Sequence, residues 1–309
     1  MEDNSETALI PEGEREAIIT HTGIKQRRLL AKDLDVKGLF ASGIGQLLSN
    51  LGWTKESVDI LICVTQTPQL AIPSVSNQLH GDLDLSQHAL CYDINSGCSG
   101  YIYGLHTVSA LLNTLQKKNA RAVFCCGDVS SQLTDENDRA TRPIFSDAVS
   151  VTGIEITEGD SEAYYNLETA GKGQRAIYSE TREGLKPVMR LNGVDVFNYS
   201  MKMVPANIAE LLNFAGKDVT FPDLFVFHQA NKLINESVRK KIKAEADKTP
   251  STLYHYGNTA SASIALTLGL NKDKISSGWV LLSGFGVGFS VASVLLNINK
   301  DFYFNCIEV

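Results

Sequence analysis

A cysteine flanked by glycines is the clearest candidate for covalent chemistry in the sequence. Cys98 lies in the segment 95–100, NSGCSG, between a strand-like run and a long apolar helix-like run. Glycines on both sides let the backbone pack closely around the thiol, and a helix start places positive partial charge beside it. This position predicts a lowered thiol pKa and a reactive nucleophile. A buried structural cysteine is the alternative.

Two polar side chains follow apolar runs later in the chain. His228 lies in the segment 227–231, FHQAN, and Asn258 lies in the segment 256–260, YGNTA. Ligands and catalytic groups gather at the carboxyl ends of strands in α/β sheets. A single His or Asn is more often a satisfied structural residue. Three such positions at strand ends nevertheless favour a site made of Cys98, His228 and Asn258.

An internal repeat predicts the elements that position these residues. Residues 44–52, IGQLLSNLG, match residues 208–216, IAELLNFAG, and the apolar run 58–62 matches 222–226 at the same offset. Each copy predicts an amphipathic helix that ends at a glycine and is followed by a buried strand. The alternative is a chance similarity between two helix–strand units.

Both copies continue with a helix and a second apolar strand, which predicts two similar α/β halves with largely buried mixed sheets. We place these halves at 1–160, with the cysteine, and 161–309, with the histidine and asparagine. The helix expected over 99–116 is apolar on most of its circumference, so it should lie between the two sheets. The charged, turn-rich stretch 132–200 predicts an insertion whose loops line or cover a site.

Four segments together resemble the signature segments of β-ketoacyl-acyl-carrier-protein synthase III, of the thiolase superfamily. They are 95–100, 228–231, 256–259 and the glycine-rich 284–289, GFGVGF; residues 22–24, TGI, resemble the amino-terminal motif. The similarity runs in order from about residue 20 to residue 296. It implies an α/β, thiolase-like duplicated fold with two pseudo-equivalent halves, mixed five-stranded sheets and buried central helices in layers αβαβα.

The resemblance also implies a decarboxylative Claisen condensation that gives a 3-oxoacyl thioester. Cys98 would accept an acyl group from acyl-CoA or an acyl-acyl carrier protein. His228 and Asn258 would stabilise the enolate formed when malonyl-acyl carrier protein loses CO2. Backbone N–H groups of Cys98 and Val287 would form the oxyanion hole. Val287 stands where the family most often has glycine, which is tolerable if its φ is negative.

Further implications concern substrates, partners and cofactors. The family's dimer places a hydrophobic residue, here Ile72, in the partner's acyl tunnel, so we expect a homodimer. No cofactor is expected, because CoA thioester is a substrate and phosphopantetheine is carried by the partner protein. Arg139 matches one position that stacks on the CoA adenine, but Ala17 and His21 replace two others, which leaves the acyl donor open. Substrate contacts are implied at Ile72, Phe145, Arg139, Asn231 and Gly193.

The two ends of the chain depart from the family pattern. The chain begins and ends later than the pattern, so the first strand of the first sheet is expected to be absent. Residues 302–304 and 307–309 have the aromatic and β-branched bias of a strand. We therefore expect the tail to pair with the vacated sheet edge, because unpaired edges are seldom left uncovered.

Composition excludes several other functions. The 309 residues are 43% hydrophobic and 20% charged, which is typical of a globular protein. A net charge of −7 predicts no nucleic-acid partner. No apolar run is long enough to span a bilayer and the amino end is acidic, so we expect a cytoplasmic protein without a membrane partner. The Cys and His spacings predict no metal site.

Two other functions remain alternatives. Relatives of the same fold move an acyl group from Cys to an oxygen or nitrogen nucleophile, often with a carboxylate at the third position, so Asn258 favours condensation. A degenerate, non-catalytic partner subunit is disfavoured because all three candidate residues are present. Relatives that condense without decarboxylation need a glutamate base near residues 65–74. This segment contains no acidic residue here, which argues against that reaction.

Overall fold

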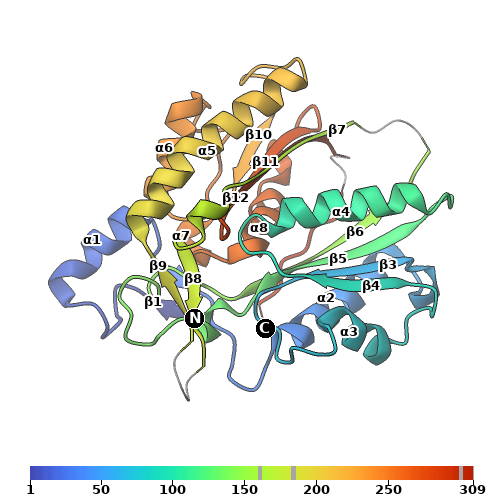
Figure 1. The fold of residues 1–309 in the computed structure, drawn as a ribbon, viewed down its shortest axis with the longest axis horizontal. Coiled ribbons are helices and arrows are strands. Elements are labelled where there is room, and N and C mark those ends of the chain that lie inside the picture. The colour runs from blue at the N-terminus through green and yellow to red at the C-terminus, as the bar shows by residue number, and fades with distance from the viewer. Residues whose placement is uncertain (159–161, 182–185, 299–301, 309) are drawn as a thin grey trace.

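Two mixed sheets, one from each half of the chain, form the framework of the computed structural model (Figure 1). The structure describes residues 1–158, 162–181, 186–298 and 302–308. In the first sheet three strands are parallel and the last is antiparallel. Its order is β4 (Leu90–Ile94), β3 (Ile60–Val64), β5 (Arg121–Asp128) and β6 (Ala148–Glu155). The second sheet has the order β10 (Leu224–Phe227), β11 (Trp279–Gly286), β12 (Ser290–Asn297) and β7 (Ala163–Thr169).

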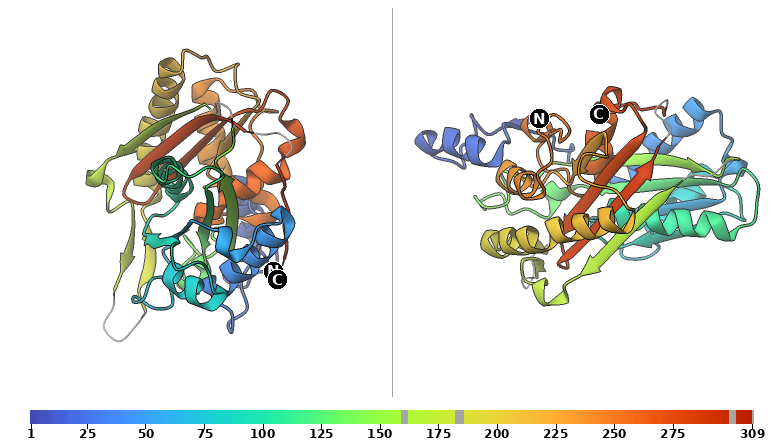
Figure 2. Two further views of the ribbon diagram at one scale, coloured as in Figure 1. Left: turned by 90° about the vertical axis from the view of Figure 1, so that its right-hand side faces the viewer. Right: turned by 90° about the horizontal axis from the view of Figure 1, so that it is seen from above.

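Helices cover both sheets and also fill the space between them, which gives five layers (Figures 1 and 2). The first outer layer packs on the first sheet and holds α2 (Val36–Leu51) and α3 (Val75–Leu83). The central layer holds α4 (Gly100–Thr114) and α8 (Ser263–Leu270). The last layer packs on the second sheet and holds α5 (Gly193–Phe214) and α6 (Lys232–Ile242).

Burial explains why the central strands are apolar throughout. Every residue of β3 and β10 is buried, since helices cover both faces of each sheet. The helix expected over 99–116 is α4, and its buried residues contact strands of both sheets. Its predicted place between the sheets is therefore confirmed. The layered α/β architecture is confirmed as well.

The repeat is also confirmed, but each sheet has four strands within the described residues instead of the expected five. β3, β5 and β6 correspond in order and direction to β10, β11 and β12. Among the described residues the first sheet has no counterpart of β7, which agrees with the expected absence of a first strand. The second sheet, in the part of the chain that the structure describes, has no counterpart of β4; there, a backbone hydrogen bond joins the Phe225 N–H to the Lys248 carbonyl at 2.8 Å.

The stretch 132–200 is only partly an insertion. β6 and β7, which belong to the two sheets, lie within it, because each closes its sheet beside an antiparallel neighbour. β8 (Ile177–Glu180) and β9 (Val188–Leu191) form a separate antiparallel pair. The boundary between halves, placed at residue 160, falls outside the described residues and stays a prediction.

The amino-terminal segment lies against the second half, where the Lys25 N–H donates to the Tyr254 carbonyl at 3.1 Å. β1 (Glu2–Asp3) pairs with β2 (Gln26–Arg27), and α1 (Glu12–Thr22) lies between them in sequence. The short α7 (Leu253–Tyr256) follows α6. No helix of the described residues is long and apolar enough to cross a membrane.

The predicted pairing of the tail with the open sheet edge is wrong. Residues 302–308 form no strand, and no backbone hydrogen bond joins them to β6. The Phe304 ring instead lies so close to Gly269 of α8 that a Cβ there would overlap it. Glu308 forms an ion pair with Arg28 at 2.9 Å. The Phe304 ring thus packs on a helix, which its residue type permits equally well.

Candidate active site

Cys98 lies in the turn between β4 and α4, where the second half of the chain packs directly against it. A Cβ at Gly97 would lie 2.8 Å from Cγ2 of Val287, and a Cβ at Gly284 would lie 2.8 Å from Cα of Ser99. Gly286 has a φ of 152° and faces the thiol, since its Cβ would lie 3.1 Å from the Cys98 sulfur. These glycines are needed because the end of β11 passes against the cysteine turn.

Burial raises the pKa of the Cys98 thiol to about 12, and the charge of Asp128 adds to the increase. Hydrogen bonds from the backbone N–H groups of Cys98 and Val287 to the sulfur lower this pKa, but by less. The predicted lowering of this pKa is therefore wrong: the cost of burying a thiolate exceeds the benefit of the helix start. Because the thiolate is the nucleophile, attack by Cys98 must include removal of its proton.

His228 follows β10 and is buried, with 2% of its surface exposed. Its backbone N–H donates to the Ser283 carbonyl of β11 at 2.8 Å, and its Nδ1 lies 2.8 Å from Oγ of Ser263. Burial lowers the pKa of the imidazole to about 3, although the Ala260 carbonyl partly opposes this decrease. The ring is therefore neutral at pH 7 and carries one N–H donor.

The side chain of Asn258 is held by hydrogen bonds at both ends of its amide. Oδ1 accepts from the backbone N–H of Ala260 at 2.9 Å, and Nδ2 donates to the Ala230 carbonyl at 3.2 Å. The Asn258 backbone also bonds to Ile144 and Ser146. One Nδ2 hydrogen is used at Ala230, which leaves the second to serve a ligand.

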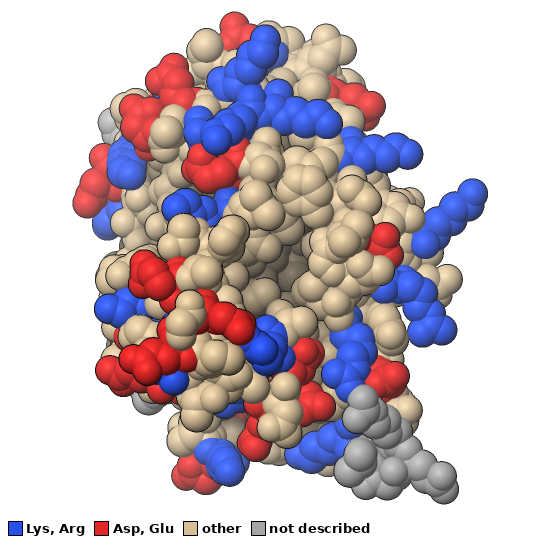
Figure 3. Space-filling view, turned by 90° about the vertical axis from the view of Figure 1, so that its left-hand side faces the viewer, with Lys and Arg blue, Asp and Glu red and all other residues tan. Residues whose placement is uncertain are grey.

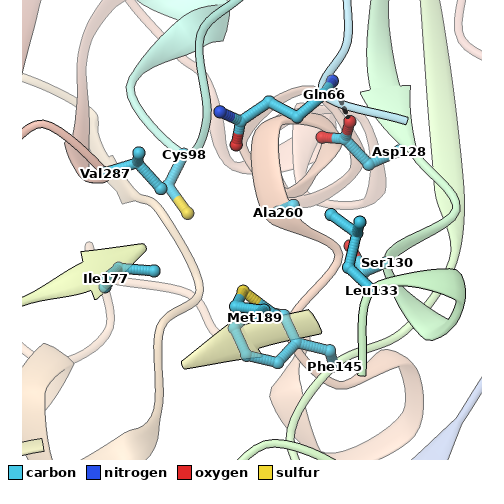
Figure 4. A pocket seen from close by; sticks show the side chains of 10 residues that line it. All are labelled: Gln66, Cys98, Asp128, Ser130, Leu133, Phe145, Ile177, Met189, Ala260 and Val287. Carbon is cyan, nitrogen blue, oxygen red and sulfur yellow. Dashed lines mark hydrogen bonds between the residues drawn. The ribbon is translucent and has the colours of Figure 1, made fainter. Parts of the chain in front are cut away.

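A cavity of about 30 Å³ lies at the Cys98 sulfur (Figure 4). The sulfur points into the space bounded by Ile177, Met189 and Phe145 (Figure 4). Apolar walls of this kind suit the hydrocarbon part of an acyl group. The lining residues are Gln66, Cys98, Asp128, Ser130, Leu133, Phe145, Ile177, Met189, Ala260 and Val287.

Asp128 is a buried carboxylate at the end of β5 that joins the two halves beside this cavity. It accepts hydrogen bonds from the Gln66 backbone N–H at 2.6 Å, from Oγ1 of Thr65 at 3.0 Å and from Oγ of Ser261 at 3.1 Å. Burial raises the pKa of Asp128, and these donors oppose the increase. Through these hydrogen bonds the carboxylate holds Thr65 and Gln66 of the first half next to Ser261 of the second half.

Contacts with shared neighbours bring the three candidate residues together. Ala260 lines the cavity with Cys98, bonds to Asn258 and acts on the ring of His228. Phe145 also lines the cavity and forms an isolated β-bridge with Asn258. Val287 is not among the residues with positive φ, so the condition stated for its backbone is met.

The other substrate residues expected from the sequence do not line this cavity. Ile72 is 84% exposed. Arg139 forms an ion pair with Glu14. Asn231 caps α6 by accepting from the Ile234 N–H, and Gly193 is the first residue of α5. Their substrate roles stay predictions.

Sequence reasoning missed several residues that the structure places at the site. Asp128 ends an apolar strand, a signal that could have identified it, since strand ends collect functional groups. Met189 and Ile177 come from the β8–β9 pair, and no motif marks them. Among the described residues, no group of three or more His, Cys, Asp or Glu side chains could hold a metal ion.

The face in Figure 3, on the side of α1 and the β8–β9 pair, has a central hollow lined by uncharged residues. Lysine, arginine and acidic side chains surround this hollow (Figure 3).

Comparison with known proteins identifies relatives over nearly the whole chain. The family described as 3-Oxoacyl-[acyl-carrier-protein (ACP)] synthase III matches residues 92–173, and its C-terminal part matches residues 212–298. Beta-ketoacyl-[acyl-carrier-protein] synthase III of Lactobacillus helveticus is 30% identical, over 95% of this chain and 93% of its own. The protein of the same name from Levilactobacillus brevis is 31% identical, with the same two coverages.

Solved structures agree with this assignment. A 3-oxoacyl-(acyl-carrier protein) synthase of Burkholderia xenovorans superimposes with a TM-score of 0.91 and 31% identity, over 97% of this chain and 90% of that one. The synthase III of Aquifex aeolicus gives 0.84 and 25%, over 92% and 91%. The thiolase-like fold and the acyltransferase class expected from the sequence are confirmed. The chain belongs to the β-ketoacyl-acyl-carrier-protein synthase III family.

Proposed function

We propose that this protein condenses a Cys98-bound acyl group with a malonyl thioester on acyl carrier protein, with loss of CO2. The observation that carries this proposal is an apolar cavity at the Cys98 thiol whose wall residue Ala260 connects it to a neutral His228 and to the fixed amide of Asn258. The names of the relatives supply the thioester class of the substrates.

In the first step the Cys98 sulfur attacks the thioester carbonyl of the acyl donor. A new carbon–sulfur bond forms, the thiol of the donor leaves, and the proton of Cys98 goes to the leaving sulfur. The negative charge that develops on the carbonyl oxygen needs nearby donors. The backbone N–H groups of Cys98 and Val287, which already act on the sulfur, are suited to this task.

In the second step the malonyl thioester loses CO2 and becomes an enolate. His228 and Asn258 donate hydrogen bonds to the enolate oxygen, and the carbanion attacks the acyl-Cys98 carbonyl, which frees the thiolate of Cys98. Donors aimed at a developing charge in a buried site are among the strongest catalytic devices in proteins. A neutral imidazole suits this role because it remains a donor throughout.

Transfer of the acyl group to an oxygen or nitrogen nucleophile is not favoured. That reaction needs a base to deprotonate the nucleophile. The third position here is the amide of Asn258, and the buried Asp128 carboxylate already accepts three hydrogen bonds. The low pKa of His228 also makes the imidazole a poor proton acceptor.

The acyl donor is either acyl-CoA or an acyl-acyl carrier protein, and the protein needs no bound cofactor of its own. Arg139, expected to contact the CoA adenine, is engaged by Glu14. Such a pair must open or rearrange before the guanidinium can stack on a base. We therefore expect carrier-protein donors to compete well with CoA donors.

The proposed assembly is a homodimer that forms along β4. This strand lies at an open edge of the first sheet, and α3 is fixed to it where Asp93 accepts from the Val75 N–H at 2.6 Å. Leu90 of β4 is exposed, and so are Leu70 and Ile72 in the segment that leads into α3. A second copy related by a two-fold axis would cover both the edge and the apolar side chains. The cytoplasmic location stays a prediction.

The experiment uses malonyl-acyl carrier protein labelled with ¹³C in the free carboxyl group, together with a panel of acyl donors. We expect labelled CO2 and a 3-oxoacyl-acyl carrier protein in equal amounts from wild type, and no 3-oxoacyl product from Cys98→Ala with an acyl donor present. An acyl group transferred to water or an amine without release of label would refute condensation.

A further inference from the structure

A buried serine makes two hydrogen bonds behind the candidate histidine. Ser263, the first residue of α8, is fully buried. Its Oγ lies 2.8 Å from Nδ1 of His228 and 3.3 Å from the backbone N of Gln229. The serine therefore contacts the side of the imidazole that carries Nδ1, which leaves Nε2 for the substrate.

The Gln229 contact determines the direction of the serine–histidine hydrogen bond. A backbone N–H can only donate, so the Ser263 oxygen accepts from Gln229. The hydroxyl proton then needs an acceptor, and among the described residues Nδ1 of His228 is the one at hydrogen-bond distance. The reverse assignment would bury a hydroxyl proton without any partner, which is costly.

The surrounding structure keeps the Gln229 backbone in place. Its side chain donates to the Phe227 carbonyl at 2.8 Å and accepts from Ser251 and Thr252, each at 3.0 Å. The Ala260 carbonyl also acts on the imidazole, as a hydrogen-bond acceptor that raises its pKa. Ser263 is the side chain at hydrogen-bond distance from Nδ1, so it acts directly on the nitrogen that must stay unprotonated.

We infer that Ser263 is a positioning residue that holds neutral His228 in the tautomer with its proton on Nε2. The inference rests on the proposed function, in which Nε2–H is the donor to the enolate oxygen. A neutral imidazole has one donor and one acceptor nitrogen, so an acceptor at Nδ1 makes Nε2 the donor. Ser263 itself touches no substrate.

The test compares Ser263→Ala with Thr267→Val. Thr267 lies on the same helix, is fully buried and bonds Oγ1 of Thr252 at 2.8 Å, so its variant loses one buried hydroxyl without affecting His228. Ring ¹⁵N spectra of histidine-labelled protein report the tautomer, and the His228 signals are those missing from His228→Gln.

In wild type and Thr267→Val we expect the proton on Nε2 alone. In Ser263→Ala we expect a mixture of both tautomers and about tenfold slower malonyl decarboxylation, less than the hundredfold expected when a donor is removed outright. Acylation of Cys98 should keep its wild-type rate in both variants.

Two results would separate the inference from the proposed function. If Ser263→Ala keeps the proton on Nε2 alone, the inference is wrong whatever the activity. If the tautomer changes while decarboxylation equals that of Thr267→Val, Ser263 does control the tautomer, but His228 is not the donor that the proposed function requires.

Discussion

Replacing Asn258 with alanine removes one of the two side-chain donors proposed for the enolate. The amide is 5% exposed and fixed at both ends by Ala260 and Ala230, so the hydrogen that it offers is preorganised. Loss of one such donor typically slows a reaction about 10²–10³-fold, roughly 2.7–4 kcal/mol. We expect malonyl decarboxylation to slow by this factor, while acylation of Cys98, which uses backbone donors, keeps its rate.

The same variant also costs stability, which the assay must separate from catalysis. Ala260 and Ala230 each lose a buried partner, and each loss costs about 1–3 kcal/mol. Asn4→Ala is a matched control, because Asn4 is also buried and its Nδ2 donates to the Ile24 and Pro143 carbonyls at 3.0 and 2.8 Å. We expect a similar drop in melting temperature in both variants, but slow decarboxylation in Asn258→Ala alone.

The assay measures the two half-reactions separately, acylation by intact mass and decarboxylation by release of labelled CO2. If both fall equally in Asn258→Ala, the residue holds the fold together and does not act on the enolate. If both are unchanged, the proposed role of Asn258 is wrong.

Three further predictions concern the thiol, the tail and the assembly. Asp128→Asn removes the negative charge that raises the Cys98 pKa, so the thiolate should form at lower pH. We expect alkylation of Cys98 by iodoacetamide to accelerate about tenfold for each unit by which the pKa falls. A pH profile of alkylation that stays in place or moves to higher pH would contradict this electrostatic effect. Deleting residues 302–309 removes the packing of Phe304 on Gly269, which contributes roughly 2 kcal/mol of apolar contact. We therefore expect the melting temperature to fall by a few degrees. An unchanged melting curve would show the tail to be dispensable. Ile72→Glu places a charge in the proposed dimer contact, so light scattering should show monomers where wild type forms dimers. A variant that is still dimeric would place the interface elsewhere.

The sequence predicted the arrangement of elements better than the electrostatics of the site. Periodicity and the internal repeat identify α4 and the paired strands, because burial on all sides leaves an apolar pattern. The glycines around Cys98 are visible for a similar reason, since the end of β11 leaves no room there for a side chain. The thiol pKa could not be predicted, because it depends on complete burial and on Asp128, which lies 30 positions away in the sequence.

Other parts of the structure leave no pattern in the sequence. Met189 and Ile177 reach the cavity only because the β8–β9 pair lies across it, and neither residue type is distinctive. The tail residues suit a strand and a helix-packing segment equally well, so composition could not separate the two. Ser263 is one of many serines, and its position behind His228 depends on how α8 packs beside β10.

The most direct test of the central claim follows one acyl group through Cys98. The protein is acylated with a single equivalent of donor, freed of excess reagent, and then mixed with malonyl-acyl carrier protein while intact mass and peptide mapping locate the acyl group. We expect one acyl mass on the peptide containing Cys98, none in Cys98→Ala, and transfer of that mass to the carrier protein as a 3-oxoacyl thioester. An acyl mass on another residue, or one that leaves Cys98 without forming that product, would contradict the account.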